Sequence, residues 1–508
     1  MSSELPNYVA SAKPVPQASR AAWFKNTAPA YAGIMLWFVF WQDIVAGRGE
    51  AGGVLSQGIG QALLALVGAA LLCHFLFYLV PGLLGMKTGL PLYVVGTSTY
   101  GVQGGFLMPG FLMGVLQFGW LAVNAFFASF LLCKFFGLDT RVPGLSHGVI
   151  AAVWAILGAF VGLKGIKYVG RVASFLPLIP LAVLVILLFK TAGGLGGFNP
   201  DKVINAGTVG GAAAVAKGAD AAAAELAEKI EGALKEATEE GKADAPKKAP
   251  AVKADEKLPL TSLGVILFIG TYVVGFFATA GAAGADFGMN NRNAKDVQLG
   301  GLFGIALATI VAGGLAMLIV AGAYGGGTVT AASGGSLNPL GLLEELMGTG
   351  VTSAIMILLA ISAFPPACFS AFIAANSFKT TLPKVNPFLS VGLGTLVSVV
   401  LAVTGWAGDV VKVFVIIGAS FGPVCGAMAA DYLLAGRKWA GPRASFNPAG
   451  WISWIVGFAV GAADFIPGLA GQVPCPPVLA FVVGFVLYFI LAKAGLQTRT
   501  LEMPKAAQ

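Results

Sequence analysis

Long apolar stretches separated by short polar segments dominate the chain from residue 28 onwards. A helix that crosses the hydrocarbon core of a bilayer, about 30 Å thick, needs about 20 mostly apolar residues. By this measure the sequence predicts spans near 28–47, 56–81, 105–136, 147–163, 168–190, 262–286, 298–324, 350–377, 386–405, 408–434, 451–467 and 477–494. We therefore expect an all-α membrane protein with twelve transmembrane helices, whose two termini lie on the same side of the bilayer.

Lysine and arginine are distributed unequally between the segments that connect these spans. With the N-terminus inside, the inner segments hold 17 of them and the short outer loops hold 3. Short loops rich in Lys and Arg remain in the cytoplasm. We therefore expect a multi-pass protein of the plasma or inner membrane with both termini cytoplasmic. Residues 1–25 are polar and do not resemble a cleavable signal peptide.

The composition agrees with this membrane assignment and limits the partners. Only 11% of the residues are charged, against about 25% in soluble domains, which excludes a soluble globular protein. The basic residues stand singly or in twos and threes, so we expect the lipid bilayer as a partner and no nucleic acid. We find no HExxH motif and no phosphate-binding loop, and we therefore predict that the chain is not an enzyme and has no cofactor.

An Ala/Lys/Glu-rich insert interrupts the pattern of spans. Of the 23 acidic residues, 11 lie between Asp201 and Glu256. Strong helix formers and Glu–Lys pairs four residues apart predict one surface helix near 210–240, followed by a flexible linker. We interpret the segment as an extracytoplasmic insert without a part in the chemistry. The alternative is an external partner or lid element.

The insert also divides the spans into groups of five, five and two. Because five is odd, the two groups of five run with opposite topology. A 5+5 inverted repeat is the architecture in which helices 1 and 6 are interrupted near the midplane and the substrate binds between them. The predicted organisation is an N-terminal tail (1–27), a first repeat (28–190), the insert (191–260), a second repeat (261–435), two extra C-terminal helices (436–496) and a C-terminal tail (497–508).

The predicted spans are numbered in chain order. Helix 3, the span 105–136, carries polar and aromatic residues at the depth of the midplane. Gln117, Trp120 and Asn124 stand at i, i+3 and i+7, so they share one helical face. A flat ring could stack on the indole while the amide reads its N–H and C=O edge. The alternative is that Trp120 packs within the bundle and the amides bond across helices.

Helices 6 and 8 contain residues that favour an irregular backbone. Gly275, Phe276 and Phe277 lie at the centre of helix 6, where glycines would allow the helix to open and leave N–H and C=O groups free for a ligand. Pro365 and Pro366 lie at the midpoint of helix 8, which predicts a kink or a break there.

Helix 1 carries Trp41, Gln42 and Asp43 about one turn outward of its midpoint. A carboxylate within a span is costly unless it faces a cavity or an interface. Asp43 is therefore either at the outer interface or part of a coupling site. Three further acids lie near helix ends, where capping and salt bridges are the expected roles: Asp286, Asp431 and Asp464.

Four stretches of the sequence resemble the nucleobase:cation symporter-1 family, which carries purines, pyrimidines, hydantoins, allantoin and some vitamins. They are GMKTGLPLYVVGTSTYGVQG at 85–104, GFFATAGAAGADF at 275–287, AANSF at 374–378, and FGPVCGAMAADYLLAGR at 421–437 with FNPAGWISWIVGFAVG at 446–461. The last is the most specific. The matches extend over nearly the whole chain outside the insert.

The resemblance implies the leucine-transporter type of 5+5 fold, with alternating access. The family's aromatic-amide element of helix 3 falls on Trp120 and Asn124, and its helix 6 tryptophan falls on Phe277. A polar side chain of helix 1 falls near Gln42. Members with a sodium site use hydroxyls in the middle of helix 8 together with helix 1 carbonyls. Here Phe364–Cys368 occupies that middle, so a proton taken up by Asp43 is an alternative to sodium.

The leading hypothesis is a symporter that imports a planar nitrogen heterocycle, with Trp120 and Phe277 on either side of the ring and Gln42 and Asn124 at its edge. An amino-acid, amine or vitamin carrier on the same fold is the alternative, followed by a membrane sensor. The candidate substrate-binding residues are Trp120, Asn124, Gln117, Gln42, Trp41, Gly275, Phe276, Phe277 and Ser370, and the candidates for coupling to Na⁺ or H⁺ are Asp43 and Ser362.

Overall fold

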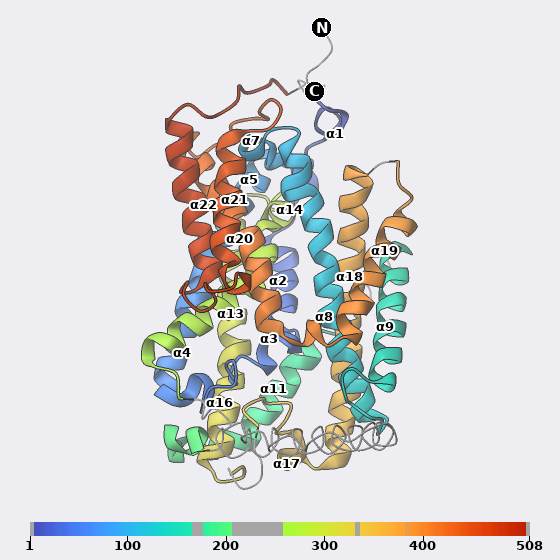
Figure 1. The fold of residues 1–508 in the computed structure, drawn as a ribbon, viewed down its shortest axis with the longest axis vertical. Coiled ribbons are helices and arrows are strands. Elements are labelled where there is room, and N and C mark those ends of the chain that lie inside the picture. The colour runs from blue at the N-terminus through green and yellow to red at the C-terminus, as the bar shows by residue number, and fades with distance from the viewer. Residues whose placement is uncertain (1–4, 165–175, 206–257, 331–335, 383, 504–508) are drawn as a thin grey trace, which may run out of the picture.

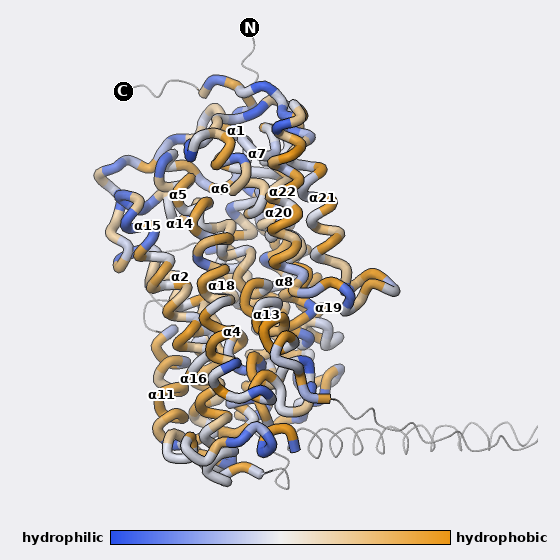
Figure 2. The backbone as a smooth tube through the Cα atoms, turned by 90° about the vertical axis from the view of Figure 1, so that its left-hand side faces the viewer, coloured by the Kyte–Doolittle hydropathy of each residue, from blue (hydrophilic) through white to orange (hydrophobic). Residues whose placement is uncertain are grey.

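All regular elements are helices in the computed structural model, which describes residues 5–164, 176–205, 258–330, 336–382 and 384–503 (Figure 1). The prediction of an all-α protein is confirmed. The hydropathy of the chain follows its long axis: apolar residues fill the middle of the helices, and hydrophilic residues gather toward the two ends (Figure 2). This is the distribution expected for a protein that spans a bilayer.

The predicted spans before the insert each have a helical counterpart. These are α2 (Thr27–Leu36) with α3 (Phe38–Gln42); α4 (Ile59–Leu72), the π-helical η4 (Cys73–Tyr78) and α5 (Leu79–Thr88); the π-helical η5 (Phe106–Phe111) with α8 (Leu112–Phe135); α9 (Leu145–Lys164); and α11 (Leu178–Thr191) with the 3-10 helix η6 (Ala192–Gly197). Helix 5 therefore continues to Gly197, beyond the predicted start of the insert.

The spans after the insert are likewise helical. They are α13 (Ser262–Ala282) with α14 (Gly284–Gly288); α15 (Ala294–Gly301), the π-helical η7 (Leu302–Leu307) and α16 (Ala308–Gly325); α18 (Thr349–Thr381); α19 (Pro387–Val403); α20 (Val410–Leu434); α21 (Pro448–Gly461); and α22 (Pro476–Lys493). The surface helix predicted near 210–240 lies outside the described residues.

Short helical turns connect these segments. They are α1 (Asn7–Ala10), η1 (Gln17–Ser19), η2 (Trp23–Lys25), η3 (Gly53–Gln57), α6 (Leu92–Val95), α7 (Thr97–Tyr100), α17 (Leu343–Met347), η9 (Trp406–Gly408) and η10 (Ala463–Phe465). Within the described ranges, nine helices are long and apolar enough to cross a membrane, and α19 and α21 are shorter apolar helices. The multi-pass membrane protein is confirmed, whereas the count of twelve and the 5+5 repeat stay predictions.

Side-chain caps fix the start of several long helices. The side chains of Thr261, Asn293, Asn386 and Asp409 each accept a backbone N–H at the first turn of α13, α15, α19 and α20. Such caps satisfy amide groups that have no partner within the helix. The helix starts are thus encoded locally, at the polar residue that precedes each apolar run.

The helix α20 lies at the centre of the bundle and packs against α13 and α22 (Figure 1). Small residues allow these close contacts. A methyl group on Gly426 would lie 2.1 Å from the carbonyl oxygen of Phe481, and one on Gly275 would lie 2.6 Å from that of Phe414. Gly275 therefore serves close packing of α13 on α20. The opening of helix 6 predicted at Gly275–Phe277 is wrong, because α13 stays helical to Ala282.

The double proline does not break helix 8. The helix α18 runs without interruption from Thr349 to Thr381, with Pro365 and Pro366 inside it. Its proline turn lies against α9, where Gly158 and Gly162 approach Ala367 and Cys368. Neighbouring helices can satisfy or shield the carbonyls that proline leaves free. Of the predicted kink or break, the break is therefore wrong and the kink stays a prediction.

Both ends of the described chain lie at the same end of the bundle. Tyr8 donates to the carbonyl of Val102, and Leu501 donates to the carbonyl of Pro442. The two acceptor segments are themselves joined, because Val102 donates to the carbonyl of Arg443. The N-terminal and C-terminal segments therefore meet on one surface, as the predicted even number of crossings would require.

Candidate functional site

The backbone of helix 1 is interrupted at Trp37, near its middle. Trp37 has φ −58° and ψ 129°, so α2 ends at Leu36 and α3 begins at Phe38. The indole of Trp41 donates to the carbonyl oxygen of Leu36 at 3.1 Å, within this break. An interruption of helix 1 was the expectation for a 5+5 carrier, and the sequence contains no Gly or Pro at this point that would mark it.

Four aromatic rings from four segments meet beside this break. The ring of Trp120 in α8 lies 5.2 Å from that of Phe276 in α13 and 5.7 Å from that of Phe414 in α20. Trp37 completes the group at 6.1 Å from Trp120. The indole N–H of Trp120 donates to the hydroxyl of Thr279 at 3.1 Å. These contacts orient Trp120 toward the break in helix 1.

The ring that the structure brings against Trp120 is Phe276, not Phe277. Successive residues of a helix point about 100° apart, so only one of the two can face α8. The ring of Phe277 instead lies 5.7 Å from that of Tyr31 in α2. A pairing of Trp120 with Phe277 is therefore absent from the described ring contacts, and Phe276 takes that place.

The amide of Asn124 is bonded to protein at both ends. Its nitrogen donates to the carbonyl of Ala363 in α18 at 2.9 Å, and its oxygen accepts from the indole of Trp154 in α9 at 2.9 Å. Gln117 has a weaker contact, from its nitrogen to the sulfur of Met113 at 3.5 Å. Asn124 thus joins three helices, and it can bind a ligand only by exchanging one of these hydrogen bonds.

Two buried donors of helix 1 have no hydrogen-bond partner. They are Nε1 of Trp37 and Nε2 of Gln42, whose side chains are 7% and 3% exposed. A buried donor without a partner costs about 1–3 kcal/mol, so each is poised to bond a group that enters the bundle. Trp41, by contrast, is fully buried and already bonded to Leu36. The sequence analysis did not single out Trp37, because only its neighbours reveal its role.

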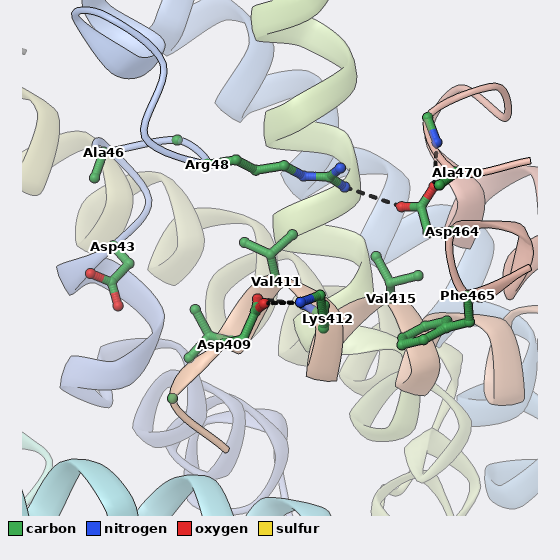
Figure 3. A pocket seen from close by; sticks show the side chains of 14 residues that line it. Asp43, Ala46, Arg48, Asp409, Val411, Lys412, Val415, Asp464, Phe465 and Ala470 are labelled. Carbon is green, nitrogen blue, oxygen red and sulfur yellow. Dashed lines mark hydrogen bonds and ion pairs between the residues drawn. The ribbon is translucent and has the colours of Figure 1, made fainter. Parts of the chain in front are cut away.

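Asp43 lies at the end of α3, where it lines a cavity of about 550 Å³ (Figure 3). Its carboxylate accepts a hydrogen bond from Nδ2 of Asn338 at 2.7 Å. Two ion pairs hold the other charged side chains of this cavity, as Figure 3 shows: Arg48 with Asp464 at 3.3 Å, and Lys412 with Asp409 at 2.8 Å. Asp43 therefore faces a cavity lined by four other charged side chains, and its bonded neighbour is the neutral Asn338.

The two candidate serines of helix 8, Ser362 and Ser370, are buried. Ser362 donates to the carbonyl of Leu359 in its own helix at 2.7 Å, and Ser370 is 7% exposed. Among the residues that the structure describes, no group of three or more His, Cys, Asp or Glu side chains could hold a metal ion. A sodium ion bound by carbonyls and hydroxyls would not need such a group.

The remaining acids have the roles expected for them. Asp431 accepts from Arg443 at 3.4 Å and from the hydroxyl of Tyr488 at 2.7 Å, and both charged side chains are buried. Asp286 accepts the backbone N–H of Leu92 at 3.0 Å. Asp464 pairs with Arg48. All three tie helix ends to neighbouring segments.

Comparison with known proteins adds to this geometry. No protein-family model matches the chain. Cytosine permeases of Escherichia coli strains K12 and O157:H7 are 23% identical to it over 484 residues, covering 94% of this chain and 93% of theirs. The inward-facing conformation of Mhp1 superposes with a TM-score of 0.62 at 14% identity, covering 99% of this chain and 97% of Mhp1.

A second structure of Mhp1, described as a nucleobase-cation-symport-1 family transporter in a closed conformation with bromovinylhydantoin bound, superposes with a TM-score of 0.59 at 14% identity, covering 97% of this chain and 96% of that one. The resemblance to the nucleobase:cation symporter-1 family is confirmed. A Na⁺-coupled sialic acid symporter has a TM-score of 0.50 at 11% identity over 98% of this chain and 93% of its own. The relatives are permeases and symporters, which are transporters and not enzymes.

Proposed function

We propose that the chain is a secondary active symporter that imports a planar nitrogen heterocycle, with cytosine and hydantoins as the first solutes to test. The observation that carries this proposal is the aromatic group around Trp120, on a chain that is similar to cytosine permeases over 94% of its length. A flat, neutral ring gains dispersion and quadrupole contacts from such a group.

In the proposed complex the heterocycle stacks on Trp120 and takes the place of one of its aromatic neighbours. Trp120 is 9% exposed and Phe276 is 1% exposed, so the rings must separate before a ligand can enter. The free N–H of Trp37 would bond a ring nitrogen or a carbonyl oxygen of the solute. Gln117, Asn124, Gly275, Phe277 and Ser370 stay secondary candidates, because their described contacts are to protein or lie away from Trp120.

The coupling ion is proposed to act at the outer half of helix 1 or between helices 1 and 8. Asp43 favours a proton, because it is the acid of the broken helix and has a neutral hydrogen-bond partner in Asn338. The charged groups that share its cavity are Arg48, Asp409, Lys412 and Asp464, which are engaged in ion pairs. Ser362 and the carbonyls of the break favour Na⁺, the ion of the sialic acid symporter that shares this fold.

We also propose that the end of the bundle holding both termini faces the cytoplasm. The connecting segments at that end contain most of the basic residues, including Arg20, Lys87, Arg292 and Arg437. The insert and the loop that contains Asn338 would then lie outside.

The test is uptake by purified protein in liposomes. Labelled cytosine, uracil, adenine, hydantoin and allantoin are offered in turn, with a sodium gradient and a proton gradient imposed separately. We expect gradient-dependent uptake of at least one of these solutes. Background uptake for every solute under both gradients would refute the proposal.

A further inference from the structure

A second cavity, of about 420 Å³, is lined by Gln42 of α3, the neighbour in the chain of Asp43, which lines the first cavity. It is enclosed by the C-terminal half of α8, the loop that follows α8, the segment around Asn338, and Met356 of α18. Its volume is within the range of about 300–1,000 Å³ that small-molecule sites occupy. It is large enough for a single-ring heterocycle.

The lining of this cavity combines aromatic rings with one unpaired amide. Phe126, Phe127 and Phe130 of α8 supply the rings, and Gln42 supplies the amide. The Nε2 atom of Gln42 is buried in a side chain that is 3% exposed, and it makes no hydrogen bond of standard geometry, although the amide lies beside the carboxyl group of Asp43. An acceptor atom on a flat solute could bond Nε2 of Gln42 and so remove the cost of burying this donor. The two faces of the solute would contact the phenyl rings.

The charges around the cavity suit a neutral solute. Lys134 is its one charged lining residue, and the Nζ atom of Lys134 lies 5.6 Å from the centre of the Phe130 ring. In the adjoining loop Asp139 and Arg141 pair at 2.6 Å. Hydrogen bonds from the backbone and the side chain of Arg141 lower the pKa of Asp139, so this pair stays ionised and internally neutralised.

The cavity continues the face of α8 that contains the central aromatic group. Trp120, Asn124, Phe127 and Leu131 stand at i, i+4, i+7 and i+11, which places them on one side of the helix. Phe127 is seven residues from Trp120, or about 10 Å along the helix at 1.5 Å per residue. A solute in the cavity would therefore wait about two turns from the central site.

We propose that this cavity is a second solute site, the outer site, which holds the planar heterocycle between Gln42 and the phenylalanines of α8 before it reaches Trp120. This inference rests on the proposed function, because the solute is the same. It adds a separate place of binding, with its own residues, on the side of the bundle remote from the termini.

The first test fills the outer site without touching the central group. Thr140 lines the cavity and is half-buried, whereas Leu138 in the same loop is 44% exposed and does not line it. Thr140→Trp is therefore the test variant, and Leu138→Trp is its matched control. At a cytosine concentration below KM, we expect Thr140→Trp to lower the initial rate of uptake at least five-fold and Leu138→Trp to change it less than two-fold. Equal melting temperatures of the two variants ensure that both are folded.

The second test removes one ring from the site. Phe130→Ala should raise KM for cytosine about five-fold, the lower limit for loss of one base-stacking ring. Its control is Phe136→Ala. Phe136 follows the last residue of α8, its side chain is 61% exposed, and it does not line the cavity. We expect no change in KM for that control.

Equilibrium binding separates the two sites. In a Trp120→Ala background we expect residual, weaker binding of labelled cytosine that Thr140→Trp abolishes and Leu138→Trp preserves. The outer site is disproved if wild type transports cytosine while the Thr140 and Leu138 variants show the same uptake and the same residual binding. If wild type neither binds nor transports cytosine, hydantoin or the other solutes of the panel, the proposed function fails and the outer site fails with it.

Discussion

Replacing Trp120 by alanine should weaken solute binding far more than an equal truncation elsewhere in the bundle. The substitution removes the ring that contacts Phe276, Phe414 and Trp37, together with the hydrogen bond to Thr279. Stacking of a base on an aromatic side chain contributes about 1–3 kcal/mol by alanine substitution. At about 1.4 kcal/mol per factor of ten, this predicts a dissociation constant for cytosine about 5- to 150-fold higher.

The assay is equilibrium dialysis of labelled cytosine with purified protein. Truncating a buried tryptophan also destabilises the fold by about 3–5 kcal/mol. The control variant must therefore also lose a packed tryptophan side chain. Trp454→Ala is the control, because it removes a part-buried indole that also donates a hydrogen bond, to the carbonyl of Ser420 at 2.9 Å, outside the central group. We expect both variants to melt earlier and only Trp120→Ala to lose affinity. A dissociation constant for Trp120→Ala within two-fold of wild type would refute the stacking role.

Three further predictions concern packing, charge and coupling. Gly275→Ala should lower the melting temperature, because its methyl group would lie 2.6 Å from a carbonyl oxygen of α20, whereas Gly392→Ala, with open space around it, should not. Arg443→Met should lower the free energy of unfolding by about 3–5 kcal/mol, because it leaves a buried carboxylate without its cation. Arg48→Met, in a partly exposed pair, should lower it by about 1 kcal/mol in chemical denaturation. Asp43→Asn should abolish acceleration of uptake by a proton gradient if Asp43 carries the proton; unchanged proton dependence would assign coupling elsewhere.

The membrane architecture could be predicted from the sequence because a span is a local property. Each apolar run of about 20 residues specifies a helix in a bilayer, whatever its neighbours. The structure confirms helices at the predicted spans, with ends set by local caps such as Thr261 and Asp409. The resemblance to a transporter family could also be recognised from the sequence, because it depended on motifs spread along the chain.

The details of the site depended on contacts between distant segments and could not be predicted. No Gly or Pro marks the break at Trp37, while Pro365 and Pro366 mark a break that does not occur. In both cases tertiary packing decides whether the helix persists. Likewise, only the rotation of α13 relative to α8 decides that Phe276 faces Trp120 and its neighbour does not.

The polar partners were hidden from the sequence for the same reason. Asn338 reaches Asp43 across 295 positions of the chain, and Trp154 bonds Asn124 from another helix. Neither residue stands in a recognisable motif. The amide of Asn124, which was predicted to form hydrogen bonds with the edge of a ligand, already forms them with two other helices in the structure.

Concentrative uptake of cytosine by proteoliposomes is the most direct test of the central claim. Purified protein is reconstituted, a sodium or proton gradient is imposed, and internal labelled cytosine is measured against the external concentration over time. The account predicts accumulation above the external concentration under one of the gradients, with collapse when an ionophore removes that gradient and no accumulation by Trp120→Ala. Internal cytosine that never exceeds the external concentration under either gradient, with hydantoin and the other solutes behaving alike, would contradict it.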